Sequence, residues 1–380
     1  MPDPETPAAG SRLLSLDAFR GMTIAGMILV NNPGSGKYRY APLAHADWDG
    51  FTPTDLVFPS FLFIAGAAIP LALDKRRERG DSFGTIAAKV VRRAAIIFAL
   101  GLFLNAFPFT KPFGELLGGL RIPGVLQRIA LCYLAAALIY AATSLRTQIL
   151  VTLGLLAGYW AALAYIPVPG YGPGGLSQEN CLSCWVDRVV MPGHIYRKFY
   201  DPEGILSTLP AIATTLIGVL SGRWLTRRDV LMPERVCGLF GAGVLLYWAG
   251  CAWNMSFPLN KALWTSSFVL YTAGLSLQAF ALCAWLIEVQ GRKRWAWPFL
   301  VFGSNAILAY VLSSLGARAL TMVEVAGPTG AKVTLRASLY DAFASWADPT
   351  FASLLFALSY VLVWLVVLSV FYRFRWFVRV

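Results

Sequence analysis

Long apolar runs alternate with short polar segments along almost the whole chain. Ten of these runs are candidate membrane helices, at roughly 14–31, 55–73, 86–106, 124–142, 148–167, 205–222, 236–255, 265–287, 298–315 and 350–371. Each is close to the ~20 residues that cross a hydrocarbon core of ~30 Å. The pattern predicts an all-α fold, a polytopic transmembrane helix bundle with about ten spans.

Composition strengthens this prediction. Hydrophobic residues make up 57% of the chain, charged residues only 14%, and the mean hydropathy is +0.60. One soluble core cannot bury so much apolar surface, so membrane lipid is an expected partner. The net charge of +12 comes from Lys and Arg in short clusters between apolar runs. That distribution is typical of topology signals and argues against nucleic-acid binding.

The basic clusters predict an orientation. More of the 32 Lys and Arg residues fall in the segments on the N-terminal side of the membrane than in the longer loops on the other side. The positive-inside rule therefore puts both termini in the cytoplasm and the loop after the first span outside. We expect residues 1–13 to be a disordered cytoplasmic segment and 14–380 a single transmembrane domain. Residues 1–11 lack the basic start and cleavage site of a signal peptide, so the first helix should remain as an anchor.

The outside loop between the first two spans holds His45, one of only two histidines. Its neighbours include Asp47 and Trp48. Histidine has an unperturbed pKa of ~6.5, so it can exchange protons near neutrality. His45 is thus a candidate acid–base or nucleophilic group, or an interfacial histidine that only hydrogen-bonds its own loop.

The second span opens with Thr52-Pro53-Thr54-Asp55. Thr at the N-cap, Pro at the first helical position and Asp at the third fit a capping arrangement. Asp55 is then structural. A helix start directed at the His45 loop could instead orient a catalytic group.

Two arginines lie inside predicted spans. Arg20 is three residues from Asp17 and shares its helix face, so the two side chains can pair; alternatively, Arg20 reaches an anionic ligand. Arg128 has no acid on its own helix. Its charge is balanced by a carboxylate from elsewhere, such as Asp17, Asp201 or Glu203, or by a bound phosphate or polarised carbonyl.

Further polar residues precede later spans on the outside. Asp201 and Glu203 come before the sixth span, and Asn260, Lys261 and Trp264 come before the eighth. Acids, an amide, a base and an indole gathered around His45 would resemble a sugar site. The other reading of Trp264 is an aromatic belt residue at the membrane surface.

Cys181 and Cys184 lie in the outside loop that also contains His194. A zinc site would need further Cys or His ligands, so we expect no metal. A disulfide and two unpaired thiols are the remaining possibilities.

Several motifs occur in an order that resembles a known family. They are Leu16-Asp17-Ala18-Phe19-Arg20-Gly21, Asn31-Asn32, His45-Ala46-x-Trp48-x-Gly50, Asp55-Leu56-Val57-Phe58-Pro59, Arg121-Ile122-Pro123-Gly124-Val125-Leu126-Gln127-Arg128, Asp201-Pro202-Glu203-Gly204 and Pro258-Leu259-Asn260-Lys261. The chain resembles a bacterial member of the heparan-α-glucosaminide N-acetyltransferase family, within the transmembrane acyltransferase superfamily. The resemblance covers almost the whole chain.

The resemblance implies transfer of an acetyl group from cytoplasmic acetyl-CoA to the amine of a glucosamine-type sugar at the outer face. It implies a multi-pass protein of the bacterial inner membrane, with an amino sugar or glycan as acceptor and a homodimer as one assembly to consider. It also implies that His45 is catalytic and that an asparagine lies nearby, best matched by Asn32, with Asn31 as the alternative.

The chemistry of acetyl transfer suggests roles for the candidate residues. An ammonium cannot attack a thioester until a base removes its proton; His45, oriented by Asp47 or a neighbouring acid, can do so, or can itself accept the acetyl group first. The inner basic groups suit the phosphates of CoA, and the candidate contacts are Arg20, Arg92, Arg93 and Arg128. The candidate acceptor-binding residues are Asn31, Trp48, Asp201, Glu203, Asn260, Lys261 and Trp264.

Two other functions fit the same pattern. Ten helices with buried charges, prolines and glycines would also suit an amino-sugar transporter, although the sequence shows no internal repeat. An O-acetyltransferase of cell-envelope glycans is the other alternative.

Overall fold

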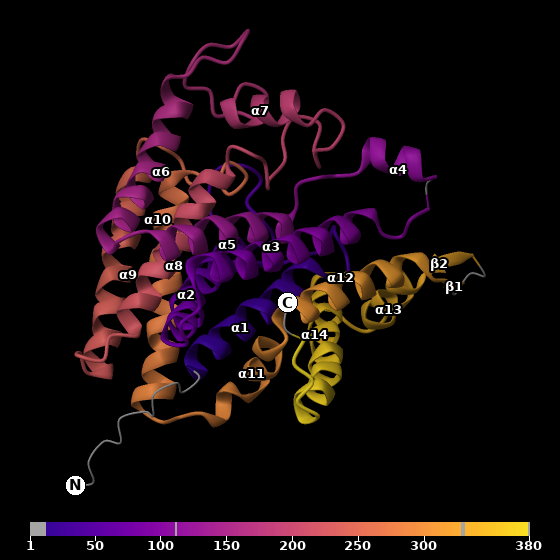
Figure 1. The fold of residues 1–380 in the computed structure, drawn as a ribbon. Helices are drawn as coiled ribbons and strands as arrows, with labels where there is room; N and C mark the ends of the chain where they lie inside the picture. The colour runs from indigo at the N-terminus through magenta and orange to yellow at the C-terminus, as the bar shows by residue number, and fades with distance from the viewer. Residues whose placement is uncertain (1–12, 111, 328–330, 379–380) are drawn as a thin grey trace.

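The computed structural model describes residues 13–110, 112–327 and 331–378, and within them the regular secondary structure is almost entirely helical (Figure 1). The predicted disordered segment 1–13 lies outside the described residues except for its last member. The helices are α1 Leu14–Asn31, α2 Val57–Glu78, α3 Phe83–Ala106, α4 Phe113–Gly119, α5 Val125–Ala142, α6 Leu145–Tyr165, α7 Leu182–Val190, α8 Thr208–Leu225, α9 Met232–Asn254, α10 Ser266–Ala284, α11 Trp297–Ser304, α12 Ala306–Met322, α13 Leu335–Ala344 and α14 Pro349–Arg373. One antiparallel hairpin, β1 Glu324–Ala326 with β2 Lys332–Thr334, departs from an all-α fold.

Each predicted apolar segment falls on a long helix or, for 298–315, on α11 and α12, which are bent by 73° at Asn305. Within the described residues, six helices are long and apolar enough to cross a membrane, and the bent pair would make seven. The protein is therefore a polytopic membrane protein. The finer count of ten spans stays a prediction, because α1, α3 and α8 do not meet the same test of length and apolarity.

Local sequence explains where several helices begin. Ser82 and Ser144 accept hydrogen bonds from the main-chain N–H groups of Thr85 and Thr147 at the starts of α3 and α6. Asp348 does the same for α14, which has Pro349 at its first position. These side chains satisfy N–H groups that have no partner inside the helix.

The core of the bundle depends on close helix packing. A Cβ added at Gly66 of α2 or at Gly218 of α8 would collide with the main chain of the other helix. Small residues at such positions let two membrane helices approach until their backbones touch. α2 is consequently held deep in the bundle, and two-thirds of its apolar window is buried.

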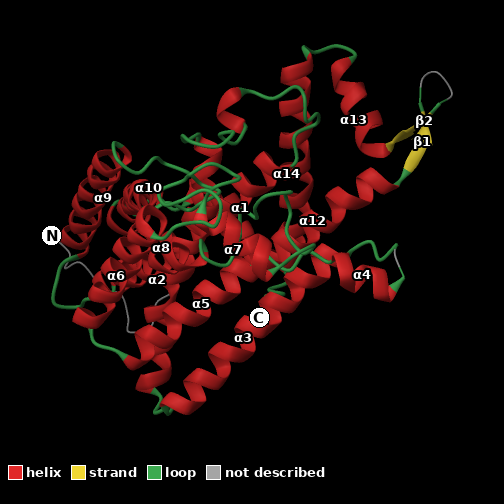
Figure 2. Ribbon diagram, turned by 90° about the horizontal axis from the view of Figure 1, so that it is seen from above, coloured by secondary structure: helices red, strands yellow, loops and turns green. Residues whose placement is uncertain are grey.

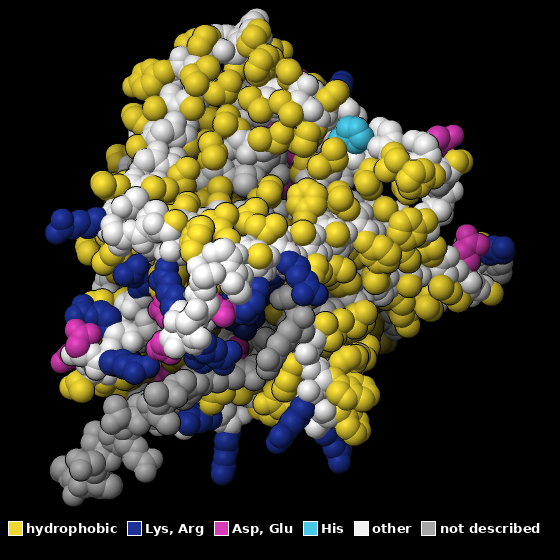
Figure 3. Space-filling model, viewed as in Figure 1, with side chains coloured by type: hydrophobic (Ala, Val, Ile, Leu, Met, Phe, Trp, Pro, Cys, Tyr) yellow, Lys and Arg dark blue, Asp and Glu magenta, His cyan; other side chains and the backbone are white. Residues whose placement is uncertain are grey.

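Different helices form the two sides of the bundle, and different kinds of side chain cover its upper and lower ends. Helices α9 and α10 lie on one side, α3 and α5 run alongside one another, and α12, α13 and the hairpin project on the other side (Figure 2). α7 and its loops cover the upper end in Figure 1. Lys and Arg side chains gather over the lower part of the face in Figure 3, whereas the upper part is mainly hydrophobic.

Candidate active site

The start of α2 carries the first part of the site. Thr52 and Asp55 form a capping box around a 3₁₀ turn, Pro53–Leu56, that leads directly into α2. The Thr52 N–H donates to Asp55 Oδ2 at 3.1 Å. The predicted capping arrangement is confirmed, and it fixes the position of the Asp55 carboxylate at the base of the preceding loop.

The other oxygen of that carboxylate contacts His45. The distance from His45 Nδ1 to Asp55 Oδ1 is 2.6 Å, and the Ala46 N–H donates to Oδ2 at 3.1 Å. The Asp55 side chain is 1% exposed and the His45 side chain 47% exposed. Asp55 is thus both a cap and the residue that orients His45. The carboxylate of Asp47, which the sequence favoured for that role, belongs to an exposed residue of the loop.

The contacts of His45 indicate its tautomer. Lys261 Nζ lies 3.0 Å from His45 Nδ1 and 3.3 Å from Asp55 Oδ1. A carboxylate at 2.6 Å from a bare ring nitrogen would be repelled, so the proton is assigned to Nδ1 and donated to Asp55. The Lys261 ammonium then donates to the Asp55 carboxylate and only lies beside Nδ1. The Nε2 lone pair is then free. That arrangement makes Nε2 the atom that can accept a proton or attack a carbonyl.

Lys261 comes from a loop more than 200 residues away in sequence, and neighbouring residues tie it to the His45 loop. The Asn260 amide donates to Asp49 Oδ1 at 3.0 Å and accepts the Leu263 N–H at 2.8 Å. Asn260 is 1% exposed, so it positions Lys261 and does not present its amide to a sugar. Burial lowers the pKa of Lys261, and the attraction of the Asp55 carboxylate opposes that effect.

Asp201 and Glu203 are already engaged by Arg121, a residue that was not among the sequence candidates. Arg121 Nη2 lies 2.7 Å from Asp201 Oδ1 and 2.5 Å from Glu203 Oε2, while its Nε donates to Asp201 Oδ2 at 2.9 Å. The Tyr196 N–H also donates to Asp201, whose side chain is fully buried. These acids form a buried ionic network with Arg121, and their predicted contact with a sugar stays a prediction. The motif around Arg121 was visible in the sequence, but its partners were not.

Arg128 has none of the predicted carboxylates as a partner among the described residues. It donates to the Gly204 carbonyl at 3.1 Å and to Ser207 Oγ at 2.5 Å, while its Nε and Nη1 have no partner there. Its guanidinium lies 5.1 Å from the ring centroid of Trp264, within cation–π range. Arg128 and Trp264 are each 1% exposed. Both readings of Trp264 are therefore wrong, because its ring lies in the core and faces neither a sugar site nor the membrane surface.

Arg128→Ala is expected to lower the free energy of unfolding by about 2–3 kcal/mol, because two buried hydrogen bonds, to Ser207 Oγ and the Gly204 carbonyl, are lost and Trp264 loses its packing. Thermal unfolding with and without CoA measures this effect. An unchanged melting temperature combined with weaker CoA binding would contradict it and restore the predicted contact with the donor.

A cavity of about 630 Å³ forms the second part of the site. It lies between α1, α2, α3, α5 and the break between α11 and α12. Its apolar walls include Phe61, Ile64, Ile97 and Ile129. Its basic residues are Arg20, Arg76, Lys89, Arg92 and Arg93. The structure brings together three of the four predicted CoA contacts; Arg128 is not in this lining.

Arg20 forms the predicted pair with Asp17, and its contact with an anionic ligand stays a prediction. Its Nη1 donates to Asp17 Oδ1 at 2.8 Å, which confirms the predicted pair, and its side chain also lines the cavity. Arg76 and Lys89, which the sequence candidates omitted, share the Asp81 carboxylate at 3.4 and 2.8 Å. Their signal was the density of basic residues around the short turn between α2 and α3.

Helix geometry relates the cavity to His45. Residues of α2 line it from Arg76 to Phe61, a run of ~22 Å at ~1.5 Å per residue. Asp55 lies six residues before Phe61, about 9 Å farther along the same axis. The cavity thus extends through the bundle from a basic mouth to within about two helical turns of the His45–Asp55 pair.

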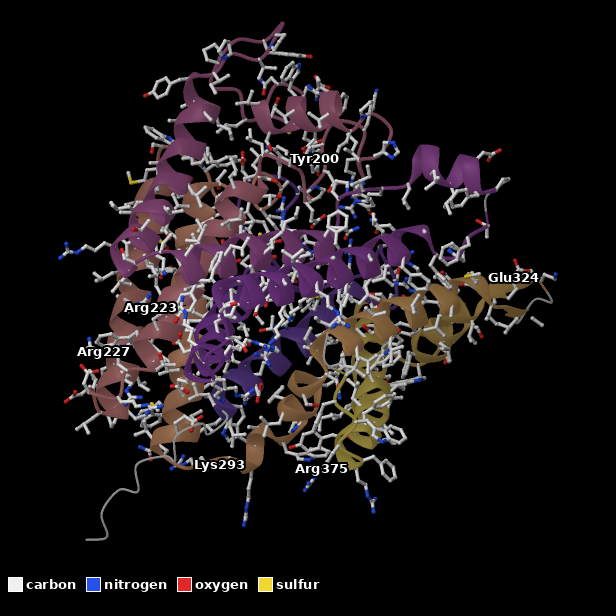
Figure 4. The ribbon with its side chains drawn as sticks, in the orientation of Figure 1. Tyr200, Arg223, Arg227, Lys293, Glu324 and Arg375 are labelled. Carbon is white, nitrogen blue, oxygen red and sulfur yellow. The ribbon has the colours of Figure 1, made fainter. Side chains whose placement is uncertain are left out.

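The remaining candidates surround the His45 loop or end α1. Trp48 donates its indole N–H to the Leu176 carbonyl at 2.9 Å and packs edge-on against Tyr200, with ring centroids 5.0 Å apart. Figure 4 shows Tyr200 at the upper end of the molecule, opposite Arg227, Lys293 and Arg375. Asn32 is buried and donates to the Ile28 carbonyl, whereas Asn31 is exposed.

The thiols of Cys181 and Cys184 are free and buried beneath the same loop. The Cys184 N–H lies 3.4 Å from Cys181 Sγ at the start of α7. Of the two readings, the structure has the thiols. Among the described residues, no group of three or more His, Cys, Asp or Glu side chains could hold a metal ion.

Comparisons with known proteins bear on this geometry. Residues 12–250 match the family model described as "Heparan-alpha-glucosaminide N-acetyltransferase, catalytic". The human heparan-alpha-glucosaminide N-acetyltransferase is 32% identical over 354 residues, covering 79% of this chain and 52% of the human protein. The mouse protein of that name is 30% identical over 361 residues, covering 81% and 54%. The chain spans about half the length of these curated relatives.

Proposed function

The chain belongs to the heparan-α-glucosaminide N-acetyltransferase family, and from this premise we propose that it moves an acetyl group across a membrane, from acetyl-CoA to an amino sugar. The donor enters from the cytoplasm and the amine of a glucosamine-type acceptor is acetylated at the outer face. The proposal includes ten spans, both termini in the cytoplasm, and a place in a bacterial inner membrane.

One observation carries the proposal. A basic, apolar-walled cavity and a carboxylate-oriented histidine lie at opposite ends of the same buried helix, α2. The cavity mouth at Arg76 is close to Glu78, which faces Arg228 at the basic end of the molecule. The His45 loop is at the other end, where Trp48 packs on Tyr200 (Figure 4). A donor lying along α2 could present its acetyl group outside without leaving the cytoplasmic side.

The cavity suits the chemistry of acetyl-CoA. Its phosphates would be held at the mouth by Arg20, Arg76, Lys89, Arg92 and Arg93, because guanidinium and ammonium groups bind phosphate by charge-assisted hydrogen bonds. The uncharged acyl arm would follow the apolar walls toward Phe61.

The proposed reaction begins at Nε2 of His45. This nitrogen takes one proton from the sugar ammonium and releases it to solvent, and the resulting amine attacks the thioester carbonyl. The new C–N bond forms, the C–S bond breaks, and the second proton of the amine passes through His45 to the departing thiolate. Asp55 holds the ring by its Nδ1–H and stabilises the imidazolium, and Lys261 balances the charge of Asp55.

Other residues keep narrower proposed roles. Asn32, with Asn31 as the alternative, is proposed to assist His45, and Trp48 is proposed to shape the acceptor side of the loop. Asp47 is exposed on this loop and is reassigned from orienting His45 to contacting the acceptor.

The purified protein, given labelled acetyl-CoA and glucosamine, tests the function. We expect an N-acetylated sugar. Uptake of sugar into liposomes without any need for acetyl-CoA would favour the transporter, and an ester linkage in the product would favour O-acetylation. Steady-state kinetics separate direct transfer, which needs both substrates bound, from an acetyl-histidine route, which gives a ping-pong pattern.

Arg92→Ala is expected to raise the KM for acetyl-CoA about tenfold with little change in kcat, because a charge-assisted contact to phosphate is worth about 1.5–3 kcal/mol. Arg79→Ala is the matched control, since Arg79 belongs to the same basic region but is outside the cavity lining. Equal effects of the two substitutions would mean that only the overall charge matters and that the donor site is elsewhere.

A further inference from the structure

The break between α11 and α12 forms one wall of the cavity and is fixed against α1. A Cβ at Gly303 would collide with the Asp17 carbonyl, and one at Gly21 would collide with the Phe299 carbonyl. The two backbones therefore touch. The break at Asn305 cannot move away from Arg20 without separating these two helices.

Asn305 uses its whole side chain to hold another part of the chain. Its Nδ2 donates to the Trp376 carbonyl at 3.1 Å, and its Oδ1 accepts the Val378 N–H at 2.9 Å. The side chain is buried, with the residue 2% exposed. An amide that both donates to and accepts from one backbone segment fixes the position and direction of that segment.

The segment that Asn305 holds is residues 374–378, which follow the end of α14 at Arg373. Val378 lines the cavity together with Ser304 and Ile307, across from the basic residues of α2 and α3. We propose that residues 374–378 are a wall of the donor cavity and that Asn305 is the positioning residue that keeps this wall in place for an anionic CoA thioester. This inference rests on the proposed function of the cavity.

Local hydrogen bonds join the segment to the end of α14, where the Trp376 N–H donates to the Phe371 carbonyl at 2.9 Å and the Arg375 N–H donates to the Tyr372 carbonyl at 3.2 Å. Phe374 and Trp376 stack on each other, with centroids 5.3 Å apart, but are 60% and 58% exposed. Their side chains therefore contribute little burial against the bundle. Arg375 is at the basic end of the molecule (Figure 4). The two hydrogen bonds of Asn305 join this segment to the break between α11 and α12, so their loss should free the wall from the cavity while its contacts with α14 and the bundle remain.

The first experiment compares Asn305→Ala with Gln148→Ala, which removes another buried amide, on α6 and away from the cavity. We expect Asn305→Ala to weaken CoA binding about tenfold and to raise the KM for acetyl-CoA with kcat nearly unchanged, as for the loss of about 1.4 kcal/mol. Gln148→Ala should leave both values unchanged. Equal effects of the two variants, or a fall in kcat alone, would overturn the inference.

The second experiment keeps Asn305 intact. Val378→Glu places a negative charge on the cavity wall, and Val378→Leu keeps it apolar; only the Glu variant should lose CoA affinity. In the unmodified protein, hydrogen exchange of residues 374–378 should slow when CoA is added. If CoA protects residues 89–93 but not 374–378, the proposed wall is wrong while the donor site stands. If the unmodified protein does not bind CoA, the proposed function itself is wrong, and the inference about this wall is wrong with it.

Discussion

His45→Ala is expected to lower kcat for acetyl transfer by about 10²–10⁴, the usual contribution of a positioned general base. The substitution removes Nε2, the atom that accepts a proton from the acceptor amine in the proposed reaction. CoA binding should persist, because His45 is not among the residues that line the cavity. Single-turnover rates and CoA binding, measured on the same preparation, check both parts.

The other histidine provides the control. His194 Nδ1 lies 2.7 Å from the Leu120 carbonyl, so its ring joins two loops and has no carboxylate in contact among the described residues. His194→Ala should change stability slightly and leave kcat within a few-fold. Near-normal turnover in His45→Ala, or equal losses in both variants, would move the chemistry away from the His45–Asp55 pair.

Arg121→Ala is expected to cost about 3–5 kcal/mol of unfolding free energy, because it leaves a buried carboxylate without its cation. Asp201 is fully buried and Glu203 nearly so, and both depend on Arg121. Burial alone would lower the pKa of Arg121, but its pairing with Asp201 and Glu203 raises the pKa well above the usual arginine value. Chemical or thermal unfolding in detergent measures the loss.

Arg227→Ala is the matched control for this network. Arg227 also pairs with a carboxylate, Asp229, but both side chains are about half exposed or more. An exposed pair is typically worth ~0–1 kcal/mol, so this variant should unfold almost like the unmodified protein. A second check is Arg121→Ala with Asp201→Asn, which removes the more buried of the two carboxylates left without a cation and should recover part of the stability. No recovery would show that Arg121 acts by packing alone.

The contacts in the structure change how three candidate acceptor-binding residues are interpreted. Lys261 was a candidate for holding the acceptor, and in the structure it contacts His45 and Asp55. Asp201 and Glu203 were candidates for the same task, and they neutralise Arg121. The acceptor is therefore expected to meet the exposed edge of the His45 loop, while Asp55, Lys261 and Asn260 behind it hold that loop in position.

The sequence by itself determined those features that depend on residues close to one another along the chain. Apolar runs of membrane length became long helices, because a backbone in lipid must satisfy its own hydrogen bonds. Thr52 and Asp55 became a capping box, and Arg20 paired with Asp17, because three residues' separation fixes the distance between side chains. The motifs around His45 and Arg128 also identified the family before any contact was known.

Only the tertiary structure decided which distant residues meet. Lys261 reaches His45 across 216 positions, Arg121 reaches Asp201 across 80, and Asn305 holds Val378 across 73. Trp264 could be read as an interfacial ring from its flanking residues, but the packing of α8 and α10 places it in the core beneath Arg128. A hydrophobic helix face indicates that the face is buried but does not identify the helix that covers it, since most apolar surfaces are nearly equivalent as partners. The pairing of buried charges is set by the few helix arrangements in which most buried polar groups find a partner.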